Sequence, residues 1–277
     1  MPTAMPVIAA IPNYNMADNL RRLLRQVLDE QDYDAVFVLD DASSDHSGDV
    51  AREFGDAVTF VWGRQNSGAG ANRNQIIDVV DDGAIIHFID ADMELETPRA
   101  AEVARDLFAH YAPRGVGAIG GLVVRQDGTQ EPHNFGASFS MWGNVTSGLP
   151  LAVDRLGDRP GLARAVQRIA GPLMHEWPNL LAPPVPTPAY WLHEGNMLIE
   201  STVLRAIGGY DPQLRSHEAQ DLAIRLEKKG IKRQFDPAIK VLHHHIDVRG
   251  KNRIKWENDA ALYMVRKHGV YRWLTNR

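Results

Sequence analysis

The first 125 residues alternate short apolar runs with longer amphipathic stretches. Short uninterrupted apolar runs are typical of strands that are buried on both faces. We expect such strands at residues 7–11, 35–39, 58–62 and 84–89. The intervening stretches have apolar side chains at helical spacing, and we expect helices from Asp18, through residues 71–80, and after an N-cap at Thr97 with Pro98 as the first helical residue. This alternation indicates an α/β fold with a parallel sheet covered on both faces.

The second half of the chain has a different pattern. Alternating apolar side chains over residues 135–141 predict one half-buried strand. Residues 145–190 are irregular and rich in proline, and connections of this length are usually functional or mobile. Helices are expected again at residues 201–207 and 218–229, each followed by a glycine that can end it.

Composition narrows the classes of function. The chain has 277 residues, a formal net charge of −5 and no cysteine. An acidic chain has no overall basic field for nucleic acid or an anionic membrane, so only a local basic patch could attract either. The absence of cysteine excludes disulfides, thiolate metal sites and cysteine nucleophiles. The sequence shows neither a signal peptide pattern nor an apolar run of the roughly 18 residues that a transmembrane helix needs, so we expect a cytoplasmic location.

Acidic residues follow two of the expected strands, where ligands of parallel sheets bind. Asp90 and Asp92 end the strand at residues 84–89, and the alternation of side chains can place both on one side. Paired carboxylates suit a hard cation such as Mg²⁺ or Mn²⁺, although two acidic residues can also simply open a solvated loop. Asp40 and Asp41 end the strand at residues 35–39. One of them could accept a hydrogen bond from the N3–H of uracil or thymine, or they could cap a turn.

A glycine-rich segment, residues 66–70, precedes the helix expected at residues 71–80. Glycines let the backbone approach a ligand, and a helix N-terminus attracts phosphate. The segment is neither a P-loop nor a dinucleotide fingerprint, and an ordinary tight connection explains it equally well.

Taken in order, these patterns resemble family 2 glycosyltransferases. The resemblance is carried by Ile11-Pro12-Asn13-Tyr14-Asn15, Leu39-Asp40-Asp41-Ala42-Ser43-Ser44-Asp45, Asn66 and Gly68 with Arg73-Asn74, Asp90-Ala91-Asp92, Glu194-Gly195-Asn196-Met197 and Gly208-Gly209-Tyr210-Asp211. That family has the GT-A fold, with a mostly parallel central sheet flanked by helices. The resemblance therefore implies a metal-dependent transfer of a sugar from a UDP- or dTDP-sugar to an acceptor hydroxyl. It also implies one compact domain, with a nucleotide-sugar-binding half at residues 1–125 and an acceptor-binding, catalytic half at residues 126–277 that holds an insertion at about 145–190.

The resemblance also implies roles for individual residues. The residues expected to bind the donor are Pro12, Tyr14, Asn15, Asp40, Asp41, Asn66, Gly68, Arg73, Asp90 and Ala91. Those expected to bind the acceptor or the sugar are Glu194, Gly195 and Asn196. The metal, Mn²⁺ or Mg²⁺, falls to Asp90, Asp92, His243 and His245; alternation sends His244 to the other face. The cation would neutralise charge on the departing diphosphate.

One position departs from the family pattern. In the segment His217-Glu218-Ala219-Gln220-Asp221-Leu222, the usual place of the general base holds Ala219. Either Glu218, which we favour, or Asp221 takes that role and the enzyme inverts, or no carboxylate base acts there and the enzyme is retaining. Both acids could also be charges favoured by a helix N-terminus, and a catalytically inactive sugar-nucleotide-binding protein is a further alternative.

A basic stretch near the C-terminus contains Arg249, Lys251, Arg253 and Lys255, followed by Trp256. The acidic composition argues against nucleic acid as its partner. A lid over the diphosphate and a solvated surface run both account for it. The expected partners are a nucleoside-diphosphate sugar and an unidentified acceptor, which could be a saccharide, a lipid-linked glycan or a small molecule. Residues 145–190 would form the acceptor-side wall, and the oligomeric state, including a homo-oligomer, stays open.

Overall fold

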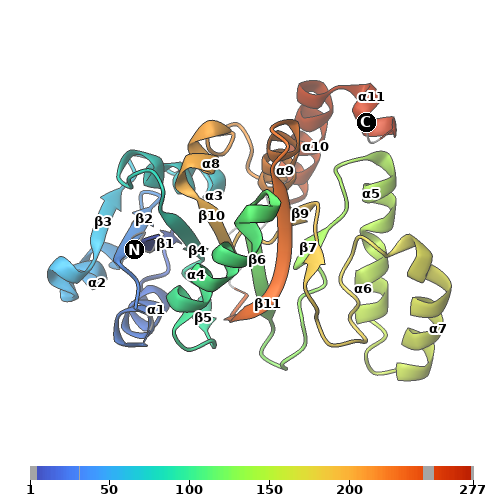
Figure 1. Ribbon diagram of the computed structural model, residues 1–277, viewed down its shortest axis with the longest axis horizontal. Helices are drawn as coiled ribbons and strands as arrows, with labels where there is room; N and C mark the ends of the chain where they lie inside the picture. Colours follow the sequence, from blue (N-terminus) through green and yellow to red (C-terminus); the bar gives the residue numbers. More distant parts are fainter. Residues whose placement is uncertain (1–4, 31, 246–252, 276–277) are drawn as a thin grey trace.

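The computed structural model describes residues 5–30, 32–245 and 253–275 (Figure 1). In these residues, nine strands form a curved central sheet in the order β3-β2-β1-β4-β10-β6-β11-β5, with β8 beside β11. The strands of this sheet are β1 Val7–Asn13, β2 Ala35–Asp40, β3 Thr59–Trp62, β4 Ile85–Ile89, β5 Met93–Leu95, β6 Val116–Val124, β8 Thr187–Pro188, β10 Asn196–Glu200 and β11 Lys232–His243. A second, small sheet pairs β7 Phe135–Gly136 with β9 Trp191–Leu192.

Helices lie on both sides of the central sheet and extend beyond it at one end (Figure 1). Their bounds are α1 Ala17–Glu30, α2 Ser47–Glu53, α3 Ala69–Arg73, α4 Ala100–Tyr111, α5 Met141–Thr146, α6 Gly148–Asp154, α7 Pro160–Ala170, α8 Ser201–Ala206, α9 Glu218–Lys228, α10 Arg253–His268 and α11 Val270–Thr275. Of the described helices, none is both long and apolar enough to cross a bilayer.

The first four strands are parallel to one another, as the sequence pattern predicts. The sheet as a whole is mixed, because β10 runs antiparallel between β4 and β6. Strands β10 and β11 from the second half of the chain therefore sit among β4, β6 and β5 from the first half. The two halves therefore share one sheet.

The apolar strands bury both of their faces. Leu20, Leu24 and Phe108 of helices α1 and α4 pack on one face of the sheet. Leu204 and Leu222 of helices α8 and α9 belong to the core cluster on the other face. Each fully buried side chain of this size contributes about 1.5–3 kcal/mol to the free energy of folding, which explains why these strands read as continuous apolar runs.

Some expected element boundaries were wrong for identifiable reasons. Thr97 does not cap a helix, because its hydroxyl accepts the N–H of Lys240 at 2.8 Å and so joins β11; helix α4 begins at Ala100. Helix α3 ends at Arg73, and residues 74–78 form a 3-10 helix. The alternation over residues 135–141 gives only the two-residue strand β7, because the Ser140 hydroxyl accepts the N–H of Gly143 and starts helix α5.

Residues 145–190 are not irregular throughout: they contain α6, α7 and a 3-10 helix. Pro150 lies within α6, and Pro160 is the first residue of α7. Proline is well tolerated in the first turn of a helix, so its presence did not exclude helices here.

Candidate active site

The order of the parallel strands places a ligand site between β1 and β4. Strand β2 lies on one side of β1 and β4 on the other, so the direction of winding reverses there. Ligands of open α/β sheets bind outside the carboxyl ends of the strands at such a reversal. At this edge the N–H of Ala91, after β4, donates to the carbonyl of Pro12 in β1 at 3.3 Å. The expected donor-binding residues therefore meet here.

Asp40 is fully buried and holds the loops that follow β1 and β2 together. Its carboxylate accepts hydrogen bonds from the side chain of Asn13 at 3.0 Å and the N–H of Ser43 at 2.9 Å. Asn15 adds to this connection, since its side-chain oxygen accepts the N–H of Ser44 at 2.7 Å. Pro12 is buried, and Tyr14 beside it is half-buried.

Asp41 fixes the glycine-rich loop. Its Oδ1 accepts the N–H of Ser67 at 2.7 Å and its Oδ2 accepts the N–H of Gly68 at 2.9 Å. Gly68 has φ of +93°, a conformation that a residue with a side chain adopts only under strain. A carboxylate oxygen can accept two hydrogen bonds, so Oδ2 keeps one acceptor position beyond that loop. Asn66, in the same loop, is held by the guanidinium of Arg215 at 3.0 Å.

Arg73 is a buried cation in a group of carboxylates. It is 2% exposed and forms an ion pair with Asp90. Burial alone would lower the pKa of Arg73, but the charges of Asp90, Glu194 and Glu218 outweigh it and raise that pKa. The guanidinium also lies 5.9 Å from the ring of Tyr210. Arg73, at the end of α3, therefore pairs with Asp90 after β4 and interacts with the charges of Glu194 and Glu218 from the second half of the chain.

Gly195 allows the carboxylate of Asp90 to take its position. A Cβ atom at Gly195 would lie 2.8 Å from Asp90 Oδ2 and 2.6 Å from the methyl carbon of Met93. The adjacent His193 is also close to Asp90, and burial lowers its pKa to about 4 despite that negative charge. His193 is therefore neutral near pH 7.

The side chain of Asn196 is buried in the central sheet. It is 1% exposed, its Oδ1 lies 2.9 Å from His87 Nε2, and its amide donates to the carbonyls of Leu122 and Ile239 at 3.2 and 3.1 Å. These contacts join β4, β6, β10 and β11. The side-chain amide of Asn196, which we expected to bind the acceptor or the sugar, thus forms hydrogen bonds within the central sheet.

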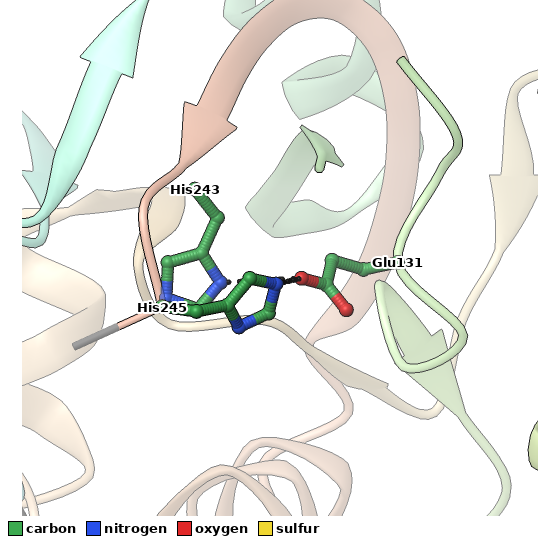
Figure 2. A group of neighbouring side chains, drawn as sticks. All are labelled: Glu131, His243 and His245. Carbon is green, nitrogen blue, oxygen red and sulfur yellow. Dashed lines mark hydrogen bonds and ion pairs between the residues drawn. The ribbon is translucent and has the colours of Figure 1, made fainter. Parts of the chain in front are cut away.

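A cluster of acidic and imidazole groups lies where β11 ends (Figure 2). His243 Nε2 is 3.3 Å from Asp92 Oδ2, and His243 Nδ1 is 3.2 Å from Glu131 Oε1. His245 Nε2 is 2.6 Å from the same oxygen of Glu131. Burial lowers the pKa of His243, but the two carboxylates outweigh burial and raise it to about 9.

The described histidines of this triplet divide as expected, although β11 ends at His243 and His245 has φ of 53°, so His244 and His245 are not part of the strand. His243 and His245 share one side with Glu131, whereas His244 Nε2 lies 3.1 Å from Glu94 on the other. One atom from each of Glu131, His243 and His245 lies within 4.8 Å of the others, so the three could hold one metal ion. Sequence reasoning missed Glu131. The available signal was an acidic residue shortly after an apolar run, residues 116–124, whose strand we had not predicted.

The two candidate bases occupy different environments. Asp221 is fully buried and lies 2.6 Å from Lys267, 2.7 Å from His268 and 2.8 Å from Arg225. Burial would raise the pKa of Asp221, but these partners hold it well below its ordinary range. Asp221 therefore fastens α9 to α10.

Glu218, by contrast, lies over the glycine-rich helix start, since a Cβ atom at Gly70 would be 2.9 Å from its Cγ. Its carboxylate contributes to the negative surroundings of Arg73. Ala219 faces elsewhere and packs with Trp177 and Trp191.

Four residues around the site have positive φ without being glycine. They are Asn15, Ala42, His217 and His245, at 54°, 61°, 63° and 53°. Asn15 belongs to the loops held by Asp40, Ala42 follows Asp41, His217 precedes Glu218, and His245 belongs to the histidine cluster. Backbone strain of this kind costs about 1–3 kcal/mol per residue and concentrates at functional sites.

A cavity of about 390 Å³ opens between residues 167–187 and strands β7 and β11. Aromatic and amide side chains line it, among them Phe135, Trp177, Phe235, Gln130, Gln167 and Asn179. The Oε1 atom of Gln167 is buried and has no hydrogen-bond partner within the described ranges. Gln130 directly precedes Glu131, so one short segment borders both the cavity and the histidine cluster.

The basic stretch near the C-terminus can be placed only in part. Arg249 and Lys251 lie outside the described residues, and Arg253 begins α10 without a described side chain. Lys255 is exposed, and Trp256 stacks under the guanidinium of Arg215 at 5.5 Å. The lid over the diphosphate stays a prediction.

Comparisons with known proteins agree with this arrangement. Residues 8–136 match the family model described as glycosyl transferase family 2. The sequence matches no curated protein. Among solved structures, the mannosyltransferase PcManGT from Pyrobaculum calidifontis, in complex with GDP-Man and Mn²⁺, is similar with a TM-score of 0.59 and 18% identity over 96% of this chain and 65% of that one.

Two further solved structures are similar. GalNAc-T7 with UDP, GalNAc and Mn²⁺ has a TM-score of 0.60 and 16% identity, over 88% of this chain and 44% of that one. TarS residues 1–349 from S. aureus, with UDP-GlcNAc, has a TM-score of 0.57 and 13% identity, over 89% of this chain and 61% of that one. The chain thus spans 44–65% of the lengths of these proteins. Likeness at such low identity shows a shared fold. The chain has the fold of these GT-A glycosyltransferases, and its residues 8–136 match glycosyltransferase family 2.

Proposed function

We propose that this protein is a glycosyltransferase that moves a sugar from a UDP- or dTDP-sugar to an acceptor hydroxyl with the help of a divalent cation. The observation that carries the proposal is that a carboxylate–imidazole cluster and a fixed glycine-rich loop both lie after the carboxyl ends of strands of one sheet. Asp92, Glu131, His243 and His245 form the cluster, and Asp41 fixes the loop. The solved structure of PcManGT, which has a similar fold, contains GDP-Man and Mn²⁺. This similarity supports a nucleotide-sugar donor. Slow hydrolysis of a UDP-sugar with Mn²⁺, lost in chelator, tests the proposal.

The residues of the cluster fit a bound cation. Donor atoms of Glu131, His243 and His245 lie within 4.8 Å of one another, and Asp92 adjoins this group through its contact with His243. Imidazole ligands suit transition metals, whereas Mg²⁺ prefers oxygen ligands and water, so we propose Mn²⁺ over Mg²⁺. When bound, the cation would offset the negative charge that develops on the departing diphosphate. Asp90, paired with Arg73, would hold the donor from the side of β4.

Metal affinity should depend on pH through His243. The pKa of His243 is about 9 without metal, so this imidazole is protonated at neutral pH and must lose its proton to bind a cation. Affinity for Mn²⁺ should therefore rise with pH, by about tenfold per pH unit at most, until pH approaches that pKa. Titration calorimetry between about pH 6.5 and 8.5, in buffers of different ionisation enthalpy, should show release of up to one proton from this group. An affinity independent of pH across that window would rule out His243 as a ligand.

The donor should carry uracil or thymine. The remaining acceptor position on Asp41 Oδ2 can receive the N3–H of these bases. A hydrogen bond to a charged group is worth about 1.5–3 kcal/mol, so UDP should bind roughly 10–100 times more tightly than GDP. The matched ligand is N3-methyl-UDP, which lacks this one donor and should bind as weakly as GDP. Equal affinity for UDP and N3-methyl-UDP, or tighter binding of GDP, would show that contacts other than Asp41 select the nucleobase.

We propose an inverting reaction in which Glu218 is the general base, with a retaining reaction as the alternative. The first half of the chain, residues 1–125, would bind the donor, and residues 126–277 the acceptor. The aromatic and amide lining of the cavity beside residues 167–187 suits an uncharged saccharide portion of the acceptor, with Gln167 Oε1 as an acceptor for a hydroxyl group. Glu194 and Gly195 would support the site through Arg73 and Asp90 rather than through Asn196.

A further inference from the structure

A chain of three polar side chains runs through the central sheet. His87 is the one polar residue in the sequence of β4, and both His87 and Asn196 of the neighbouring strand β10 are buried. His87 Nδ1 lies 2.7 Å from the hydroxyl of Tyr33, and His87 Nε2 lies 2.9 Å from Asn196 Oδ1. Burying polar groups costs free energy that an apolar side chain would not, so packing alone does not account for His87.

The hydrogen bonds of this chain run in one direction. The side-chain amide of Asn196 donates to the carbonyls of Leu122 and Ile239. Its Oδ1 therefore faces His87 and can only accept. The proton of the neutral imidazole thus lies on Nε2, and Nδ1 accepts the hydroxyl proton of Tyr33. Burial lowers the pKa of His87 to about 4 and raises the pKa of Tyr33, so this arrangement persists near neutral pH.

Asn196 connects this chain to the proposed donor site through Gly195. The carbonyl of Gly195 accepts the N–H of Asp90 at 3.2 Å, and a Cβ atom at Gly195 would lie 2.8 Å from the Asp90 carboxylate. A small shift of this backbone would therefore press on the carboxylate that pairs with Arg73. Gly121 of β6 makes room for the Asn196 amide, because a Cβ atom at Gly121 would lie 2.3 Å from its Nδ2. The amide is thus held closely in one position.

We propose that His87 is a positioning residue, which sets the backbone at Gly195 and through it the carboxylate of Asp90 for the nucleotide-sugar donor. The imidazole is enclosed in the sheet, so it acts through Asn196 and not by touching a ligand. Without its N–H, Asn196 Oδ1 is left unsatisfied, which favours a rotated amide and a shifted backbone at the adjoining Gly195. The role of Asp90 in donor binding rests on the proposed function, whereas the hydrogen-bond chain does not.

The affinity for UDP with Mn²⁺, measured by calorimetry, tests this role. His87→Leu fills a similar space without hydrogen bonds and should weaken binding about tenfold or more. His87→Gln places an amide N–H near the position of Nε2 and should keep the affinity within about threefold of the unchanged protein. Ser201→Ala is the matched control, because the buried Ser201 hydroxyl accepts the N–H of Ala84, just before β4, at 3.1 Å. It should lower the melting temperature by about 2–4 °C and leave the affinity unchanged.

Nitrogen NMR of isotope-labelled protein supplies a readout that needs neither donor nor metal. The His87 signals, assigned by their absence from His87→Gln, should show a protonated Nε2 and an unprotonated Nδ1. The amide signals of Asp90 and Gly195 should shift in His87→Leu and stay in place in Ser201→Ala. Tyr33→Phe lacks only the hydroxyl and serves if His87→Leu does not fold. It should populate the other imidazole tautomer and shift the Gly195 amide signal.

Several outcomes would overturn the role of His87. They are a proton on Nδ1 in the unchanged protein, unmoved Asp90 and Gly195 signals in the folded variants, and full UDP affinity of His87→Leu. Equal losses of affinity in His87→Leu and Ser201→Ala would also do so, since stability alone would then explain them. If the unchanged protein binds no UDP with Mn²⁺, the proposed function fails, and the Asp90 and Gly195 signals still decide whether His87 positions this backbone.

Discussion

Replacing Asp92 by alanine is expected to abolish metal-dependent transfer while leaving the fold intact. Asp92 Oδ2 lies 3.3 Å from His243 in the proposed cation site, and the residue follows β4 in a loop outside the two main apolar cores. Loss of a charged ligand that helps neutralise the leaving diphosphate should cost several kcal/mol in the transition state. Turnover should fall by about 10³-fold or more, since each 1.36 kcal/mol is a factor of ten.

Glu94→Gln is the matched control for this variant. Glu94 lies two residues further along and pairs with His244, which faces away from the cluster. It should keep both turnover and Mn²⁺ affinity. Turnover of a UDP-sugar and Mn²⁺ titration of each variant, with circular dichroism to check the fold, supply the measurements. Full activity of Asp92→Ala, or equal losses in both variants, would remove Asp92 from the metal site.

Local pattern predicted much of this site because its parts lie at strand ends. Asp90 and Asp92 directly follow a buried strand, and the histidine triplet lies at the end of another apolar strand. The parallel half of the sheet was predicted for the same reason, since its strands are apolar on both faces.

What the sequence could not show is which distant groups meet. Glu131 contacts His243, 112 residues away, and the strand that carries it there, β6, contains three glycines that weaken its apolar signal. Asn196 belongs to a familiar Gly-Asn pattern, yet the antiparallel insertion of β10 between β4 and β6 buries its amide. From the sequence, Asp221 can be read as a charge favoured by the start of a helix, but in the structure Lys267 and His268 of α10 bind its carboxylate.

The environment of Asp221 sharpens the question of the general base. A base must be free to accept a proton, and Asp221 is held by three cationic or imidazole partners with its pKa well below the ordinary range. Asp221→Asn should therefore act on stability. Breaking a buried ion pair costs about 3–5 kcal/mol, and because the amide keeps some hydrogen bonds we expect the lower end of that range. Thermal unfolding measures it, and the activity of the folded fraction should change little.

Glu218→Gln is expected to lower turnover by about 10²–10⁴-fold with donor affinity nearly unchanged. Glu218 is 6% exposed, follows the strained His217, and lies over Gly70 near Arg73. The amide has the same shape but cannot take the proton of the acceptor hydroxyl. Kinetics that separate kcat from the KM of the donor give the measurement, with Asp221→Asn as the comparison. The reverse ranking of the two losses would assign the role to Asp221.

The double variant Glu218→Gln, Ala219→Asp tests whether the reaction needs a carboxylate base on α9. It restores a carboxylate at the position where family 2 enzymes usually have one, on the side of α9 that packs with Trp177 and Trp191, near the cavity that we propose for the acceptor. An inverting enzyme that needs a carboxylate base should recover part of its turnover. If instead Glu218→Gln stays near full activity and Ala219→Asp changes nothing, no carboxylate of α9 acts as a base. Because Glu218 lies on the side of Arg73 and Asp90, it would then serve to balance charge around the donor. The anomeric proton of the product, read by NMR, should in that case show retention.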